Sequence, residues 1–109
     1  MVKWSFVVDE LLKLTTFVHG TVGMFMFIHE ELVQALAMAC YNYKKLKKWQ
    51  KMRETAEYAI NEICDPMIEW IDTYGYLAYP LNYCYHEFFS GMKKTFESYI
   101  DYANNPPED

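Results

Sequence analysis

Apolar side chains recur at alternating steps of three and four residues through the middle of this sequence. The positions are Phe25, Ile28, Leu32, Ala35, Ala39, Leu46, Trp49, Ala56, Ile60 and Ile63, interrupted at Asn42 and Arg53. A repeat of 3.5 residues sustained over about six heptads is typical of one amphipathic helix, here about 64 Å long. The spacing predicts a long central helix over residues 21–64, which is either continuous or broken near Asn42.

Shorter helices are expected on either side of this segment, because no run of period-2 alternation predicts a strand. The first ends at His19, where Gly20 suits the left-handed residue that closes a helix. The Asp65-Pro66 pair predicts the start of a third helix, since Asp caps helix N-termini and Pro is pre-organised for the first turn. Pro80 then separates the third helix from a fourth.

The fold class predicted is therefore all-α, a small bundle of about four helices. With 109 residues, 52% of them hydrophobic, the chain has enough apolar mass for one core. A single helical domain is expected over residues 1–104, followed by a disordered polar tail at residues 105–109. The core positions expected of the third and fourth helices are Met67, Ile71, Tyr74, Ala78, Leu81, Cys84 or Tyr85, Phe88, Met92, Phe96, Tyr99 and Ala103.

The cellular location expected from the sequence is cytoplasmic. Residues 14–28, the most apolar stretch, number 15, whereas a membrane-spanning helix needs about 20 apolar residues. The three cysteines, Cys40, Cys64 and Cys84, form no CxxC pair and follow no secretory signal, which favours a reducing compartment. We therefore expect neither a membrane span nor a disulfide framework.

No residue pattern predicts catalysis, a metal site or a cofactor. His29 and His86 each precede a glutamate directly, and adjacent helical residues point about 100° apart, so neither pair can chelate. The Glu-x-x-His spacing of helical metal sites does not occur, nor does a G-x-S-x-G elbow or a Gly-rich phosphate loop. The sequence therefore indicates a protein that is not an enzyme.

A cluster of tyrosines around Pro80 is the first candidate binding site. The five residues are Tyr74, Tyr76, Tyr79, Tyr83 and Tyr85. They cannot all point into one core, because successive helical positions face apart. Exposed tyrosines are good anchors at protein interfaces, because they offer large contact area at low entropic cost. The alternative is ordinary aromatic packing with the hydroxyls reaching water or backbone.

A basic segment, residues 44–53, is the second candidate. The chain is acidic, with 15 Asp and Glu against 10 Lys and Arg, yet six of those ten bases fall in this segment. On a continuous helix Lys44, Lys47, Lys48 and Lys51 would form one ridge opposite Leu46 and Trp49. Like charges four residues apart oppose helix formation, which a bound phosphate backbone would offset. Nucleic-acid binding is therefore the alternative function, and a solvated helix face is the plainer interpretation.

Four large apolar residues in a row, Met24, Phe25, Met26 and Phe27, form the third candidate. They cover every face of a helix, so at least one must point away from its own bundle. We therefore expect a contact with a second chain here, most simply in a homodimer.

Together these features predict a small helical module for protein–protein interaction that regulates or antagonises a larger protein partner. The tyrosine cluster would hold that partner, and the acidic body of the chain would orient it.

Overall fold

The computed structural model describes the backbone of residues 4–108 and the side chains of residues 20–108 apart from Ala78. All regular elements in this part of the chain are helical, so the expected all-α class is confirmed. They form three rods, however, and not a bundle of four. The rods are α1 (Trp4–Lys45), then α2 (Trp49–Ala59) with the π segment η1 (Ile60–Cys64) and α3 (Asp65–Tyr74) as one uninterrupted helix, and finally α4 (Leu81–Asn104).

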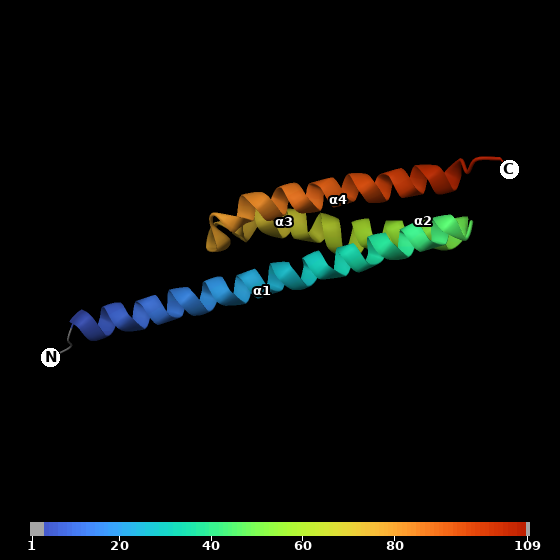
Figure 1. Cartoon of the computed structure of the whole chain (residues 1–109). Coiled ribbons are helices and arrows are strands. Elements are labelled where there is room, and N and C mark those ends of the chain that lie inside the picture. Colours follow the sequence, from blue (N-terminus) through green and yellow to red (C-terminus); the bar gives the residue numbers. More distant parts are fainter. Residues whose placement is uncertain (1–3, 109) are drawn as a thin grey trace.

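Successive rods run antiparallel and lie side by side (Figure 1). The second rod packs against both others, and α1 and α4 contact each other less closely than each contacts α2. A 3₁₀ turn, η2 (Gly75–Ala78), and a cis peptide bond before Pro80 lead from α3 to α4. Because α1 has 42 residues and α4 has 24, the amino-terminal part of α1 extends beyond η2, and the molecule is 79 Å long but only 20 by 17 Å across (Figure 1).

The bounds of the first two predicted helices were wrong. Gly20 does not end a helix but lies within α1, where an added Cβ would meet no other atom within 4 Å. One glycine costs a helix only about 1 kcal/mol, which neighbouring residues can outweigh. The long helix is thus the first in the chain, and it ends at Lys45 instead of continuing to residue 64 or breaking at Asn42.

The turn after α1 has the hydrogen bonds of a Schellman motif. Lys47 has a φ of 56°, and its N–H donates to the carbonyl of Lys44 at 3.1 Å. The N–H of Lys48 donates to the carbonyl of Tyr43 at 2.9 Å, which completes the pair of bonds that defines the motif. Glycine usually occupies the left-handed position. Since lysine stands there in this chain, the sequence carried no signal for the turn.

Replacing Lys47 by glycine is expected to stabilise the protein. The left-handed conformation costs a residue with a Cβ about 1–2 kcal/mol, and glycine avoids that cost but loses more backbone entropy on folding. We expect Lys47→Gly to raise the free energy of unfolding by about 0.5–1 kcal/mol in urea denaturation. The matched control is Lys51→Gly inside α2, which should lower it by a similar amount. A Lys47→Gly variant less stable than wild type would contradict the left-handed assignment.

At the predicted boundary, Asp65-Pro66, the second rod changes from π-helical to α-helical geometry. Proline inside a helix lacks an N–H and crowds the carbonyl four residues earlier. Here the wider turn of η1 precedes Pro66, which stands in the first turn of α3. Asp65 makes no side-chain capping bond, and its carboxylate pairs instead with Lys93 of α4 at 2.7 Å. The predicted boundary is therefore not a break between two helices, and the predicted cap does not form.

One apolar core joins the three rods. Its buried residues are Val22, Met26, Val33, Cys40, Met52, Ala56, Ala59, Ile60, Ile63, Cys64, Met67, Ile71, Phe89, Phe96 and Ala103. On α1 this is not the predicted face: Phe25, Ile28 and Leu32 are 37%, 55% and 44% exposed, and Leu46 is 63% exposed in the turn. The predicted stripe of α1 lies outside because the second rod packs on the opposite side of the helix.

The predicted core face is closer to the structure in α3 and α4. Met67 and Ile71 are buried as expected, and so are Phe96 and Ala103. Tyr74 and Leu81 were predicted wrongly, because they are about half exposed. Of the two alternatives Cys84 and Tyr85, Cys84 is exposed and Tyr85 packs against the core. Phe89 rather than Phe88 is fully buried, because Phe89, Phe96 and Ala103 share one heptad spacing toward α2. Ala78 lies outside the described side chains.

Candidate functional site

The tyrosine turn, which we define as Tyr74, Tyr76, Tyr79 and Tyr83, lies at the end of the bundle where α3 passes into α4. These four rings are 48%, 70%, 75% and 71% exposed, respectively. The fifth predicted residue, Tyr85, does not belong with them, because it packs partly buried against the core with its ring stacked 6.2 Å from that of Phe89. Burial raises the pKa of Tyr85, and a hydrogen bond with Glu30 raises it further.

Close packing of the backbone holds the tyrosine turn in place. Gly75 is buried, and a Cβ at this position would lie 3.1 Å from both Asn82 Cβ and Ile71 Cγ2. Leu77 packs partly buried against the core between the exposed Tyr76 and Tyr79. The rings are therefore presented by an anchored turn, which lowers the entropic cost of binding through them.

The basic turn, defined as Lys44, Lys45, Lys47, Lys48 and Lys51, lies at the opposite end of the bundle. The predicted ridge along one helix face was wrong, since the chain reverses direction between Lys45 and Trp49. Two of these lysines contact aromatic rings: Lys44 Nζ lies 4.2 Å from the ring centroid of Tyr102, and Lys45 Nζ lies 4.8 Å from that of Tyr41. The cations are gathered in one place, and Lys45 covers the ring of Tyr41.

The apolar run at residues 24–27 is divided between the inside and the outside of the molecule. Met26 is fully buried in the core of its own chain, so it cannot make the predicted contact with a second chain. Met24 and Phe27 are 59% and 48% exposed, and Phe25 lies beside Trp70 with ring centroids 5.1 Å apart. Three of the four predicted contact residues thus remain at the surface.

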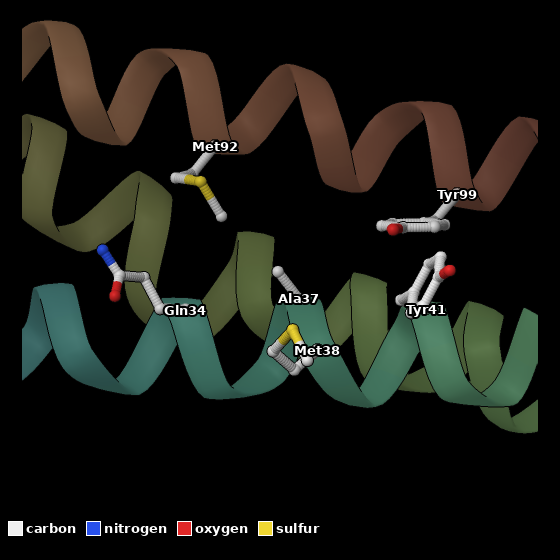
Figure 2. A pocket seen from close by; sticks show the side chains of 6 residues that line it. All are labelled: Gln34, Ala37, Met38, Tyr41, Met92 and Tyr99. Atoms are coloured by element: carbon white, nitrogen blue, oxygen red, sulfur yellow. The ribbon is translucent and has the colours of Figure 1, made fainter.

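A groove between α1 and α4 holds a cavity of about 550 Å³. It is lined by Gln34, Ala37, Met38, Tyr41, Met92 and Tyr99 (Figure 2). Figure 2 shows the Tyr41 ring of α1 and the Tyr99 ring of α4 pointing toward one another. None of the residues that line the groove is charged. Burial raises the pKa of Tyr99, so its hydroxyl stays neutral. The groove is therefore an apolar contact surface.

The histidines of the described side chains are bonded within the fold. His29 Nδ1 lies 2.7 Å from the Phe25 carbonyl, and His86 Nε2 lies 3.1 Å from an Asp72 carboxylate oxygen across α3 and α4. Among these side chains, no group of three or more His, Cys, Asp or Glu residues converges as metal ligands.

The three cysteines differ sharply in their surroundings, which predicts one reactive thiol. Cys40 and Cys64 are fully buried, and burial raises the pKa of each to about 11, whereas Cys84 is exposed. A thiol with this pKa is about one part in a thousand thiolate at pH 8. We expect a disulfide reagent to modify Cys84 rapidly and the other two thiols only after unfolding in denaturant.

The Cys84→Ser variant provides the control for this measurement. It should show no rapidly reacting thiol in the folded state and two after denaturation. Rapid modification of a second thiol in the folded wild-type protein would contradict the burial of Cys40 and Cys64.

One segment of α1, Gly20–Lys45, is long and apolar enough to cross a membrane by length and composition, with a mean hydropathy of 1.3. The apolar stretch at residues 14–28, by contrast, was predicted to be too short to cross a membrane. Core helices of soluble proteins pass the same test when they are mostly buried, whereas only 17% of the apolar window in this segment is buried within the fold.

The fold and its surfaces define the chain as an elongated antiparallel arrangement of three helices with an overhanging first helix. Comparison with known proteins adds no family, since no protein-family model, curated protein or solved structure matches the chain. Its function is therefore argued from its own residues.

Proposed function

We propose that this chain is a protein–protein interaction module whose tyrosine turn binds a larger partner, and that it regulates or antagonises that partner without catalysis of its own. The observation that carries the proposal is the exposure of four tyrosine rings on one anchored turn. A cytoplasmic location is part of the proposal, because three unpaired cysteines suit a reducing compartment.

Contact with water alone does not explain why several tyrosine rings are exposed on one short turn. Tyr76, Tyr79 and Tyr83 each expose at least 70% of their surface within eight residues of chain. Tyrosine is enriched at the energetic centres of interfaces, because its ring buries large area with two side-chain torsions and its hydroxyl can still hydrogen-bond. Buried Gly75 and partly buried Leu77 hold the turn from within, so partner binding need not order it.

The first experiment places a photo-cross-linking amino acid at Tyr79 in cells that produce the protein. Tyr58, which is 55% exposed on α2, is the matched control position. The proposal expects an adduct with a different protein from position 79 and none from position 58. Equal yields from both positions, or adducts only with further copies of the same chain, would contradict it.

Binding is then measured with the purified partner by calorimetry. Because hot-spot tyrosines contribute about 2 kcal/mol or more, the Tyr76→Ala and Tyr79→Ala variants should each weaken affinity by about thirtyfold or more. The Tyr58→Ala variant should leave it unchanged. Unchanged affinity in both turn variants would show that the partner binds elsewhere.

Nucleic-acid binding at the basic turn is the second candidate. It is supported by the concentration of Lys45, Lys47, Lys48 and Lys51, all exposed, at one end of the molecule. Phosphate binding by lysines predicts a steep salt dependence, with log affinity falling by about 0.9 for each contacted phosphate per tenfold rise in salt. The acidic remainder of the chain, by contrast, repels a phosphate backbone.

Fluorescence anisotropy with labelled duplex DNA, single-stranded DNA and RNA at two salt concentrations tests this candidate. Micromolar binding that weakens with salt and is lost when Lys44, Lys47, Lys48 and Lys51 are changed to Glu would support it. No binding at low salt would exclude it and leave the tyrosine turn as the proposed site.

A further inference from the structure

The outward face of α1 carries an apolar stripe along its length. Met24, Ile28 and Leu32 are 59%, 55% and 44% exposed, and Ala35 and Met38 extend the exposed stripe by two further turns. The buried positions Met26 and Val33 point the other way, into the core of the chain. The stripe therefore lies on the side of α1 away from the core, with Met38 at its edge, where it also lines the groove against α4.

This stripe follows the heptad spacing of a coiled-coil seam. Thr21, Ile28 and Ala35 are seven residues apart, and Met24, Glu31 and Met38 interleave with them at steps of three and four. In the sequence the same spacing continues toward the amino terminus through Phe17, Leu14, Glu10 and Val7, whose backbone belongs to α1, so two of the ten positions are glutamates. The repeat thus extends past the end of the three-helix bundle, along the part of α1 that overhangs it (Figure 1). A partner for this face must be a helix about as long as α1 itself.

Charge along α1 favours one orientation of such a partner. The amino-terminal half contains Asp9, Glu10 and Lys13, and at the carboxy-terminal end Lys45 is exposed, whereas Lys44 contacts the Tyr102 ring of α4. Two parallel copies in register would place Glu31 beside Glu31 and Lys45 beside Lys45, which is unfavourable. Two antiparallel copies bring Asp9 and Glu10 of each helix near Lys45 of the other and keep the two Glu31 residues apart. A second copy therefore fits this face better in the antiparallel direction than in the parallel one.

We infer that two copies of this chain pair through the outward faces of their α1 helices as an antiparallel coiled coil. A two-fold axis crossing α1 between Met24 and Ile28 makes the apolar centre self-complementary, since Met24 of each copy then packs against Ile28 of the other. In this register Asp9 and Glu10 come within about one helical turn of the exposed Lys45 of the second copy. The same residues of both copies form this contact, so the assembly is complete with two copies. It uses none of the residues of the tyrosine turn, so it is independent of the proposed function.

Sedimentation equilibrium of the purified full-length chain tests the pairing. At about 100 μM, wild type is expected to have about twice the chain mass of 13.0 kDa. The Ile28→Glu variant would place a carboxylate from each copy in the apolar centre, so its dissociation constant should rise at least about tenfold. A monomeric wild type at this concentration would overturn the inference.

Tyr58→Glu is the matched control, because Tyr58 on α2 has the same 55% exposure as Ile28. Both variants replace surface residues, so both should keep the helical circular dichroism of wild type. The control should associate as wild type does. Association weakened equally by both substitutions, or by neither, would overturn the α1 contact.

Disulfide cross-linking distinguishes the antiparallel pair from a parallel one. In a Cys84→Ser background, Ala35→Cys chains alone should not cross-link, because the two positions would lie about 27 Å apart along the antiparallel pair. Mixing them with Phe17→Cys chains should give a cross-linked heterodimer, since residue 17 of one copy is level with residue 35 of the other. Cross-linking of Ala35→Cys chains with each other, or failure of the mixture to cross-link, would overturn the antiparallel register.

Discussion

Val33→Asp is expected to unfold the protein or to reduce its free energy of unfolding by about 4 kcal/mol or more. Val33 is fully buried on the face of α1 that packs toward α2 and α4. An aspartate there must either bury an unpaired carboxylate or be protonated at a cost, and both states lose the packing of the valine. Because domains of this size are stable by only about 5–15 kcal/mol, the loss is a large part of the total. Urea denaturation followed by circular dichroism measures it.

The adjacent Leu32→Asp variant is the control, because it introduces the same residue into the same helix. Leu32 is 44% exposed, so its aspartate remains in contact with water. We expect a loss of about 1 kcal/mol, mostly from the poor helix propensity of aspartate. Its larger effect should be on self-association, since Leu32 belongs to the outward stripe. Similar losses in the two variants, or a greater loss at Leu32, would mean that α1 faces the core as the sequence pattern had predicted.

Phe89→Ala is expected to lower the free energy of unfolding by about 3–5 kcal/mol. The ring is fully buried in α4, where it contacts Phe88 edge-on at 5.1 Å and Tyr85 in a stacked arrangement. Removing the ring loses the free energy gained when it is transferred from water into the core. It also leaves a cavity, which the elongated α4 can close only in part. The same denaturation experiment gives the value, and the slope with denaturant should not change.

Phe88→Ala is the neighbouring comparison. Phe88 is only partly buried against the core, so its loss should cost about 1–2 kcal/mol. The difference between two adjacent phenylalanines isolates the burial of the ring, since helix propensity changes equally in both. Equal costs would contradict the orientation of α4.

The proposed interaction surface was identifiable from sequence in outline. Five tyrosines in twelve residues around Pro80 indicated that some rings must be exposed, and Tyr74, Tyr76, Tyr79 and Tyr83 are. Sequence could not show that Tyr85 turns inward, because that depends on the position of Phe89 and Glu30 around it. The α1–α4 groove was missed altogether, since its two walls lie far apart in the chain.

The turn between α1 and α2 was missed for a local reason. Turn prediction depends on residues that suit a left-handed backbone, and the residue that adopts it here is Lys47. The glycine that did resemble a helix end, Gly20, lies inside α1. Both errors have the same cause. A lysine in a left-handed turn and a glycine inside a helix each cost about 1 kcal/mol, which is less than the packing energy of a whole helix.

By itself, the sequence determined that this protein is helical, that no strand competes, and that α4 begins after Pro80 and ends before the polar tail. The tertiary structure decided which face of α1 is buried. Ile28, Leu32 and Ala35 recur at helical spacing, and so do Met26, Val33 and Cys40 on the opposite side. A helix that is apolar on two faces satisfies the same periodicity twice, so only its packing against the second rod selects the core face and leaves the other exposed.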